Sequence, residues 1–195
     1  MRVFLAGATG VIGQALVPHL VAAGHVVAGM TRTEGKADGL RAAGAEPILC
    51  DVYDRTHLIA VVNEFRPDVV IHQLTDLPDD AAQLDARRGG NARIRTEGTR
   101  NLLDAASSSG AQKVLAQSIA WELPPGEGAD AVAELERSVL AVHGVVLRYG
   151  QFYGPGTYHP TEPPGEPQVH VEAAALATVD ALDAPSGVIT VIDRA

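Results

Sequence analysis

Three glycines near the start of the chain have the spacing of a turn that holds phosphate. Gly7, Gly10 and Gly13 follow the apolar run Arg2-Val3-Phe4-Leu5-Ala6 and open an apolar helix pattern. Glycine at these places permits a tight turn, a close backbone approach to a pyrophosphate and close helix packing, while free N–H groups at the helix N-terminus attract anions. A second apolar run, Val26 to Met30, follows the helix, as a dinucleotide-binding unit requires. We therefore expect cofactor contacts from Gly7, Thr9, Gly10, Val11, Ile12 and Gly13.

The residues after the second apolar run bear on which dinucleotide is bound. Arg32, within Thr31-Arg32-Thr33, carries a guanidinium at the point where the adenosine ribose would lie. A carboxylate there would accept hydrogen bonds from the ribose diol, whereas a guanidinium pairs with a 2′-phosphate. Lys36 adds a second cation, so the sequence favours NADP over NAD. The alternative is a solvated arginine, because Glu34 and Asp38 are close by.

Cysteine and histidine offer few further candidates for chemistry. Cys50 is the single cysteine, and at the end of an apolar run it is expected to be a small buried residue rather than a nucleophile. His72, at a strand end, is expected to be packed or hydrogen-bonded rather than a base. His159, beside Tyr158 in a proline-rich segment, is the better acid or base candidate. The histidines lack metal-ligand spacing, so we expect no metal.

Composition limits the class of protein. A chain of 195 residues with 46% hydrophobic and 20% charged residues is typical of one globular domain, here 1–195. The net charge of −9 and the lack of a basic run argue against nucleic acid as a partner. No stretch is apolar for the roughly 18 residues that a membrane span needs, and the N-terminus does not read as a leader peptide. We expect a cytoplasmic protein with a small-molecule substrate and no membrane contact.

Short apolar runs alternate with helix patterns along the chain. The runs cover residues 3–6, 26–30, 48–50, 69–71, 114–116, 145–147 and 188–192. This alternation predicts an α/β fold, a Rossmann-type doubly wound parallel sheet of about seven strands with helices on both faces. Helix patterns cover 94–106 and 132–140, and another begins after Asp54, a candidate N-cap. Pro- and Gly-rich segments at 123–128 and 154–167 are predicted loops on the ligand-binding side of the sheet.

Five motifs occur together along the chain. They are Gly7-Ala8-Thr9-Gly10-Val11-Ile12-Gly13, Cys50-Asp51-Val52, Pro67-Asp68-Val69-Val70-Ile71-His72, Glu97-Gly98-Thr99-Arg100-Asn101-Leu102-Leu103 and Leu147-Arg148-Tyr149-Gly150-Gln151-Phe152-Tyr153-Gly154-Pro155-Gly156. In this combination the chain resembles the extended and atypical branch of the short-chain dehydrogenase/reductase superfamily, which contains the NAD-dependent epimerase/dehydratase proteins. The resemblance implies that Asp51 contacts the adenine amino group and that Val52 and Leu74 lie at the cofactor. A role for Asp51 as a strand-end cap stays open.

The chain departs from that family at the catalytic helix. Catalytic members carry Tyr-x-x-x-Lys, in which the lysine lowers the tyrosine pKa so that the tyrosine acts as acid or base. With Glu136 as the guide to alignment, these positions fall on Gly128 and Val132, and no tyrosine or lysine occurs between residues 114 and 148. Arg95 stands where the family has an asparagine. The catalytic candidates that remain are Ser118, Tyr153 and His159.

The resemblance also implies a shortened substrate region, 151–195, after a cofactor-binding core, 1–150. We therefore expect an NADP-binding enzyme that acts on a small oxygenated substrate in bacterial biosynthesis, as a reductase or as a non-redox isomerase, dehydratase or cyclase. The alternative is a catalytically silent dinucleotide-sensing or binding protein that has kept the cofactor cradle. Family members commonly pair two helices between copies, so a homodimer through 94–106 and 132–140 is expected.

Overall fold

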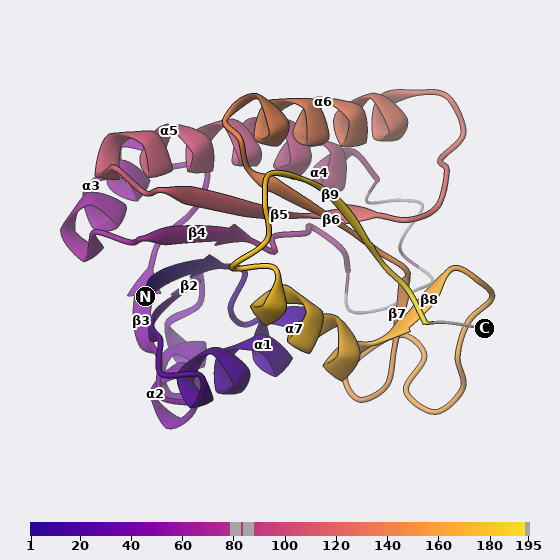
Figure 1. The fold of residues 1–195 in the computed structure, drawn as a ribbon, viewed down its shortest axis with the longest axis horizontal. Helices are drawn as coiled ribbons and strands as arrows, with labels where there is room; N and C mark the ends of the chain where they lie inside the picture. Colours follow the sequence, from indigo (N-terminus) through magenta and orange to yellow (C-terminus); the bar gives the residue numbers. More distant parts are fainter. Residues whose placement is uncertain (79–82, 84–87, 194–195) are drawn as a thin grey trace.

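The computed structural model describes residues 1–78, 83 and 88–193, which form an α/β fold built on one parallel sheet (Figure 1). Its strands are β1 (Arg2–Ala6), β2 (Val26–Thr31), β3 (Glu46–Leu49), β4 (Val69–His72), β5 (Lys113–Ile119), β6 (Val145–Tyr149) and β9 (Gly187–Val191). They lie in the order β3-β2-β1-β4-β5-β6-β9, and each neighbouring pair is parallel. The chain winds outward in both directions from β1 and β4, so the predicted doubly wound sheet is confirmed.

Helices cover both faces of the sheet (Figure 1). On one face, α1 (Val11–Ala22), α2 (Ala37–Ala42) and α7 (Val171–Asp180) pack on a core that includes Leu5, Leu16 and Leu147. On the other face lie α3 (Arg55–Phe65), α4 (Arg88–Arg93), α5 (Thr99–Ser109) and α6 (Glu127–Ala141). Phe4 and Leu58 pack in the core beneath α3 and α5. Successive strand residues point to opposite faces, so both faces of a buried strand must be apolar.

Local sequence explains where several elements begin and end. The Asp54 carboxylate accepts a hydrogen bond from the His57 N–H at 3.0 Å, which caps α3 as the sequence predicts. Gly110, with φ of 73°, ends α5 in the left-handed conformation. Cys50 is 3% exposed, and burial raises the pKa of its thiol to about 11, so the expected inert role is confirmed.

The glycine turn packs against the end of β4 with no room for side chains. Gly7 has φ of 92°, and a Cβ there would lie 2.6 Å from the Gln73 carbonyl oxygen. A Cβ on Gly13 would lie 2.2 Å from the Gly7 carbonyl oxygen. The Gln73 N–H also donates to the Ala6 carbonyl at 2.9 Å, which continues the β1–β4 ladder up to the turn. Helix α1 therefore starts directly at the carboxyl edge of the sheet.

Two elements differ from the sequence expectation. The helix expected over 94–106 starts earlier, as α4, and contains a π-helical turn, Ile94–Gly98, before α5 continues. The region after β6 contains β7 (Gln151–Tyr153) and β8 (Gln168–His170), a parallel pair that encloses the predicted loop. Strands of three residues carry too little pattern to be recognised in sequence.

Among the described residues, no helix has the length and apolar content of a membrane span.

The helices expected to pair two copies carry charge on their outer surface. Arg100 of α5 forms an ion pair with Glu134 of α6, with 3.2 Å between nitrogen and oxygen. Within α5 and α6, which are described throughout, no large hydrophobic side chain is exposed. A polar surface provides little apolar area to bury between copies, and the homodimer stays a prediction.

The fit of Gly13 against Gly7 gives a direct test of the turn. We expect Gly13→Ala to lower the free energy of unfolding by about 3 kcal/mol, because its Cβ meets rigid backbone. Gly89→Ala is the matched control, since nothing lies within 4 Å of its Cβ position, and its effect should stay within about 1 kcal/mol. Urea unfolding monitored by circular dichroism measures both, and equal midpoints would contradict the packing.

Candidate cofactor and substrate site

The N-terminus of α1 is built to receive an anion. Gly10 is its N-cap, no side chain caps the helix, and the first turn contains no acidic residue. The first N–H groups of a helix have no partner within it, so those after Gly10 are available to phosphate oxygens. A Cβ on Gly10 would lie 3.3 Å from the Gly7 carbonyl oxygen, in the space of this cradle. The predicted turn thus fits the pyrophosphate of a dinucleotide.

Cations lie beside the turn, where β2 ends. A hollow of about 340 Å³ runs between α1 and α2 and is lined by residues that include Thr9, Gln14 and Lys36. Arg32 leaves the end of β2 with its side chain 53% exposed, and its nearest carboxylate is Asp76 at 3.9 Å. An ion pair this long and this exposed contributes little stability. Arg32 is therefore available to a stronger anionic partner such as a phosphate.

The residues expected at the adenine lie on the α3 and α5 face of the sheet. Asp51 is exposed, and its carboxylate accepts from the Tyr53 N–H at 3.0 Å, which is the capping role that the sequence left open. Val52 is 1% exposed, and its carbonyl accepts from the Asn101 side chain at 2.9 Å. Leu74 is partly buried against the same core. Sequence reasoning missed the role of Asn101, which joins α5 to the Asp51–Val52 turn.

Ser118 belongs to a polar network inside the α6 layer. Its hydroxyl donates to Glu136 at 2.6 Å, and Ser118 is 3% exposed. Arg148 on β6 donates to both oxygens of the same carboxylate, at 2.8 and 2.5 Å. Burial alone would raise the pKa of Glu136, but the hydrogen bonds from Arg148 and Ser118 outweigh it and lower that pKa. The Ser118 hydroxyl is thus engaged with Glu136, and a substrate-binding role for it requires this bond to open.

The other two catalytic candidates lie in the region after β6, Tyr153 at the end of β7 and His159 in the loop that follows it. The Tyr153 hydroxyl donates to Asp193 at 2.7 Å, and its ring packs edge-on to His170. That hydrogen bond, and then burial, raise the pKa of Tyr153. The His159 carbonyl accepts from the Gly154 N–H at 2.9 Å, so His159 and Tyr153 share one turn. The described hydrogen bonds connect neither residue to Ser118.

Tyr149 and His72 are structural, although both lie near the carboxyl edge of the sheet. Burial raises the pKa of Tyr149 to about 12, and its hydroxyl lies between Gln73 and Thr178, at 3.1 and 2.7 Å. His72 is 2% exposed, and Nδ1 accepts from the Leu74 N–H at 3.2 Å. Its Nε2 therefore donates to the Thr99 hydroxyl at 3.0 Å. Burial, and then the charge of Arg95, lower the pKa of His72 to about 4, which confirms the expected packed role.

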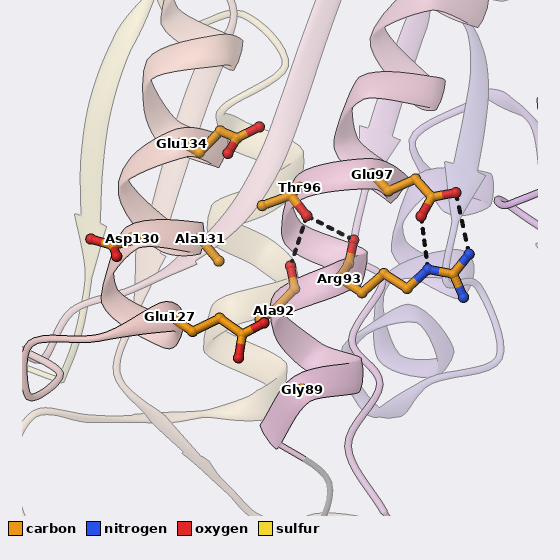
Figure 2. Close-up of a pocket in the computed structure, with 9 residues that line it drawn as sticks. All are labelled: Gly89, Ala92, Arg93, Thr96, Glu97, Glu127, Asp130, Ala131 and Glu134. Atoms are coloured by element: carbon orange, nitrogen blue, oxygen red, sulfur yellow. Dashed lines mark hydrogen bonds and ion pairs between the residues drawn. The ribbon is translucent and has the colours of Figure 1, made fainter.

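A larger hollow of about 770 Å³ lies between α4 and α6 (Figure 2). Glu127, Asp130 and Glu134 line its α6 side, and Glu97 on the opposite side pairs with Arg93 at 2.7 Å. Its carboxylates outnumber its cations, so it would repel a phosphate. This hollow is therefore a poorer place for a phosphate than the glycine turn.

The turn, the sheet order and the residues around them define a dinucleotide-binding Rossmann-type protein. The family model for the NAD dependent epimerase/dehydratase family matches residues 3–133, so the chain belongs to this family. It is 42% identical over 184 residues to the 3-diazoavenalumate denitrifying reductase of a Streptomyces species, a match that covers 80% of this chain and 58% of that protein. It is 33% identical over 125 residues to the UDP-glucose 4-epimerase of Mycolicibacterium smegmatis, covering 59% of this chain and 37% of that one. The chain thus spans less than two thirds of the curated relatives it matches.

Solved structures show the same fold. The UDP-glucose 4-epimerase of Thermus thermophilus, in complex with NAD, superposes with a TM-score of 0.77 at 24% identity, covering 98% of this chain and 78% of that one. The Thermotoga maritima UDP-glucose 4-epimerase with UDP-glucose gives a TM-score of 0.80 at 18% identity, covering 98% and 77%. Sequence identities this low support a shared fold, but they do not identify the substrate.

The Glu136 network predicts a pH-dependent contribution to stability. We expect Glu136→Gln to lower the free energy of unfolding by about 2 kcal/mol, less than for a fully buried pair because the Arg148 side chain is 43% exposed. The lowered pKa of Glu136 means that its stabilisation is present above the ordinary value of 4.5 and is lost as pH falls through the lowered value. Urea midpoints of wild type and variant should therefore converge in acid.

Glu134→Gln is the control for this experiment. Glu134 has one ion pair at 3.2 Å at the surface, so its replacement should change stability by less than about 0.5 kcal/mol. Equal effects of the two substitutions at neutral pH would show that the Glu136 network adds nothing.

Proposed function

We propose that this chain is the cofactor-binding part of an NADP-dependent reductase. The reaction that it catalyses does not require a tyrosine as general acid. The proposal is carried by the phosphate cradle at Gly7, Gly10 and Gly13, and it is supported by the alignment through Glu136, which assigns the family's tyrosine and lysine positions to Gly128 and Val132. The cradle supports dinucleotide binding. At these two positions the helix offers no side chain that transfers a proton.

The kind of reduction follows from this lack of a proton donor. Reducing a carbonyl places charge on oxygen, and an acid must neutralise it. A reduced nicotinamide, when bound, supplies a hydride. A diazonium group is already cationic, so hydride addition followed by loss of N2 leaves a C–H bond and needs no acid. The Streptomyces relative is named for a reductive removal of nitrogen from a diazo compound, and we propose the same class of substrate here.

The preference for NADP rests on charge around the ribose end of the cradle. Arg32 is half-exposed with a weak ion pair, and Lys36 lines the hollow beside Thr9. These cations support a 2′-phosphate, and no carboxylate follows β2 directly to hold a ribose diol. Solved relatives are described in complex with NAD, so the preference for NADP proposed here rests on the residues of this chain, Arg32 above all.

A catalytically silent dinucleotide-binding protein is the second candidate. It is favoured by the engagement of Ser118 with Glu136 and of Tyr153 with Asp193. A measurement of catalytic turnover distinguishes this binding protein from the reductase.

Cofactor preference is tested by titration. We expect the protein to bind NADPH more tightly than NADH, and Arg32→Ala to weaken NADPH binding by about 1.5 to 3 kcal/mol through loss of a charge-assisted bond. Arg137→Ala, an exposed arginine on α6, should leave the affinity unchanged. Nucleotide fluorescence gives the dissociation constants, and equal values for the two cofactors would refute the preference.

Turnover is tested with chemically simple substrates. The protein with NADPH should convert 4-diazobenzoate to benzoate and N2, faster than NADPH alone and faster than the Gly13→Ala variant. The same protein with NADP should not oxidise UDP-glucose or simple alcohols, because Gly128 and Val132 provide no base. Mass spectrometry of the products measures both, and oxidation of an alcohol without diazo reduction would reverse the assignment.

A further inference from the structure

Arg95 is a partly buried cation that has no counter-ion among the described residues. Among the residues that the structure describes, none forms a hydrogen bond or an ion pair with its guanidinium. Burial lowers the pKa of Arg95, and no described carboxylate offsets that effect. Partial burial leaves the guanidinium fewer water contacts than a surface arginine has, so an anionic partner would stabilise it.

The guanidinium nitrogens are nevertheless reachable. The described buried nitrogen and oxygen atoms that are sealed from solvent and lack a partner belong to Gln73 and Gln117, not to Arg95. The Arg95 nitrogens therefore keep some contact with solvent. A side chain held in this way is ready to bind an anion.

The topology places Arg95 just beyond the end of β4. Strand β4 ends at His72, and α5 runs back down the sheet from Thr99, whose hydroxyl contacts His72 at 3.0 Å. Arg95 precedes Thr99 by one turn, so it lies further toward the carboxyl edge. Open parallel sheets bind ligands in the crevice at this edge. Arg95 also stands in the π-helical turn Ile94–Gly98, an irregularity often found at functional sites.

The surroundings of Arg95 suit a small anion other than the cofactor pyrophosphate. His72 beside it is neutral, so Arg95 provides the charge. The pyrophosphate cradle belongs to α1, which covers one face of the sheet, whereas Arg95, Thr99 and His72 lie toward the α5 face. A planar guanidinium forms two parallel hydrogen bonds with a carboxylate.

We propose that Arg95 binds a carboxylate of the substrate and so selects small organic acids. This inference rests on the proposed function for its substrate, and it identifies the group that the protein recognises. The cofactor phosphates are the other source of an anion at this edge of the sheet, and the experiment separates the two.

The test uses benzoate and its neutral isostere benzamide as probes, titrated by calorimetry into protein saturated with NADP. Wild type should bind benzoate at least about tenfold more tightly than benzamide, and Arg95→Gln should remove this difference. Arg95→Met keeps the apolar stem, and it should lose benzoate binding while unfolding at the same or a higher urea concentration. Arg100→Gln, which changes an exposed arginine of α5, should behave as wild type.

The outcomes are distinct. Benzoate binding that survives Arg95→Gln overturns the inference, and so does a tenfold loss of NADPH affinity in that variant, which would assign Arg95 to a cofactor phosphate. If diazo reduction is absent but benzoate binding still depends on Arg95, the proposed reaction fails while the carboxylate site stands.

Discussion

The close contact between the glycine turn and the end of β4 is the constraint on which the rest of the structure depends. Gly7 lies against the Gln73 backbone and Gly13 of α1 lies against the Gly7 backbone, so a side chain at either position would push the turn and the helix away. Because α1 starts at this edge, its free N–H groups face the crevice where β1 and β4 diverge. The cofactor cradle is thus a consequence of backbone packing.

Polar groups inside the protein tie distant strands to this edge. The Gln73 amide donates to the Tyr149 hydroxyl, and Tyr149 in turn donates to Thr178, whose hydroxyl donates to the Ala174 carbonyl. This directed chain joins β4, β6 and α7 across the sheet. On the opposite face, Glu136 joins α6 to β5 and β6 through Ser118 and Arg148. Both networks hold the strand ends in place, and they leave few side chains free to act on a substrate.

Charge is distributed unevenly over the fold. The chain carries a net charge of −9, and its larger hollow is lined by carboxylates. Arg32, Lys36 and Arg95 nevertheless lie along the carboxyl edge without close carboxylate partners among the described residues. Anionic ligands are therefore attracted to one edge of an otherwise acidic protein. A site of this kind binds and orients its ligand more readily than it transfers protons.

The sequence by itself determined the sheet, the glycine turn, the Asp54 cap and the inert Cys50, because each depends on residues within a few positions of one another. It also shows that no tyrosine or lysine lies between residues 114 and 148, from which the absence of the family's catalytic pair is predicted. Only the tertiary structure decided that Ser118 is engaged with Glu136, that Tyr153 pairs with Asp193 and that Arg95 has no partner within the described part of the chain. Those facts depend on contacts between separate elements, and no local pattern of apolar residues encodes which polar side chains meet across a fold.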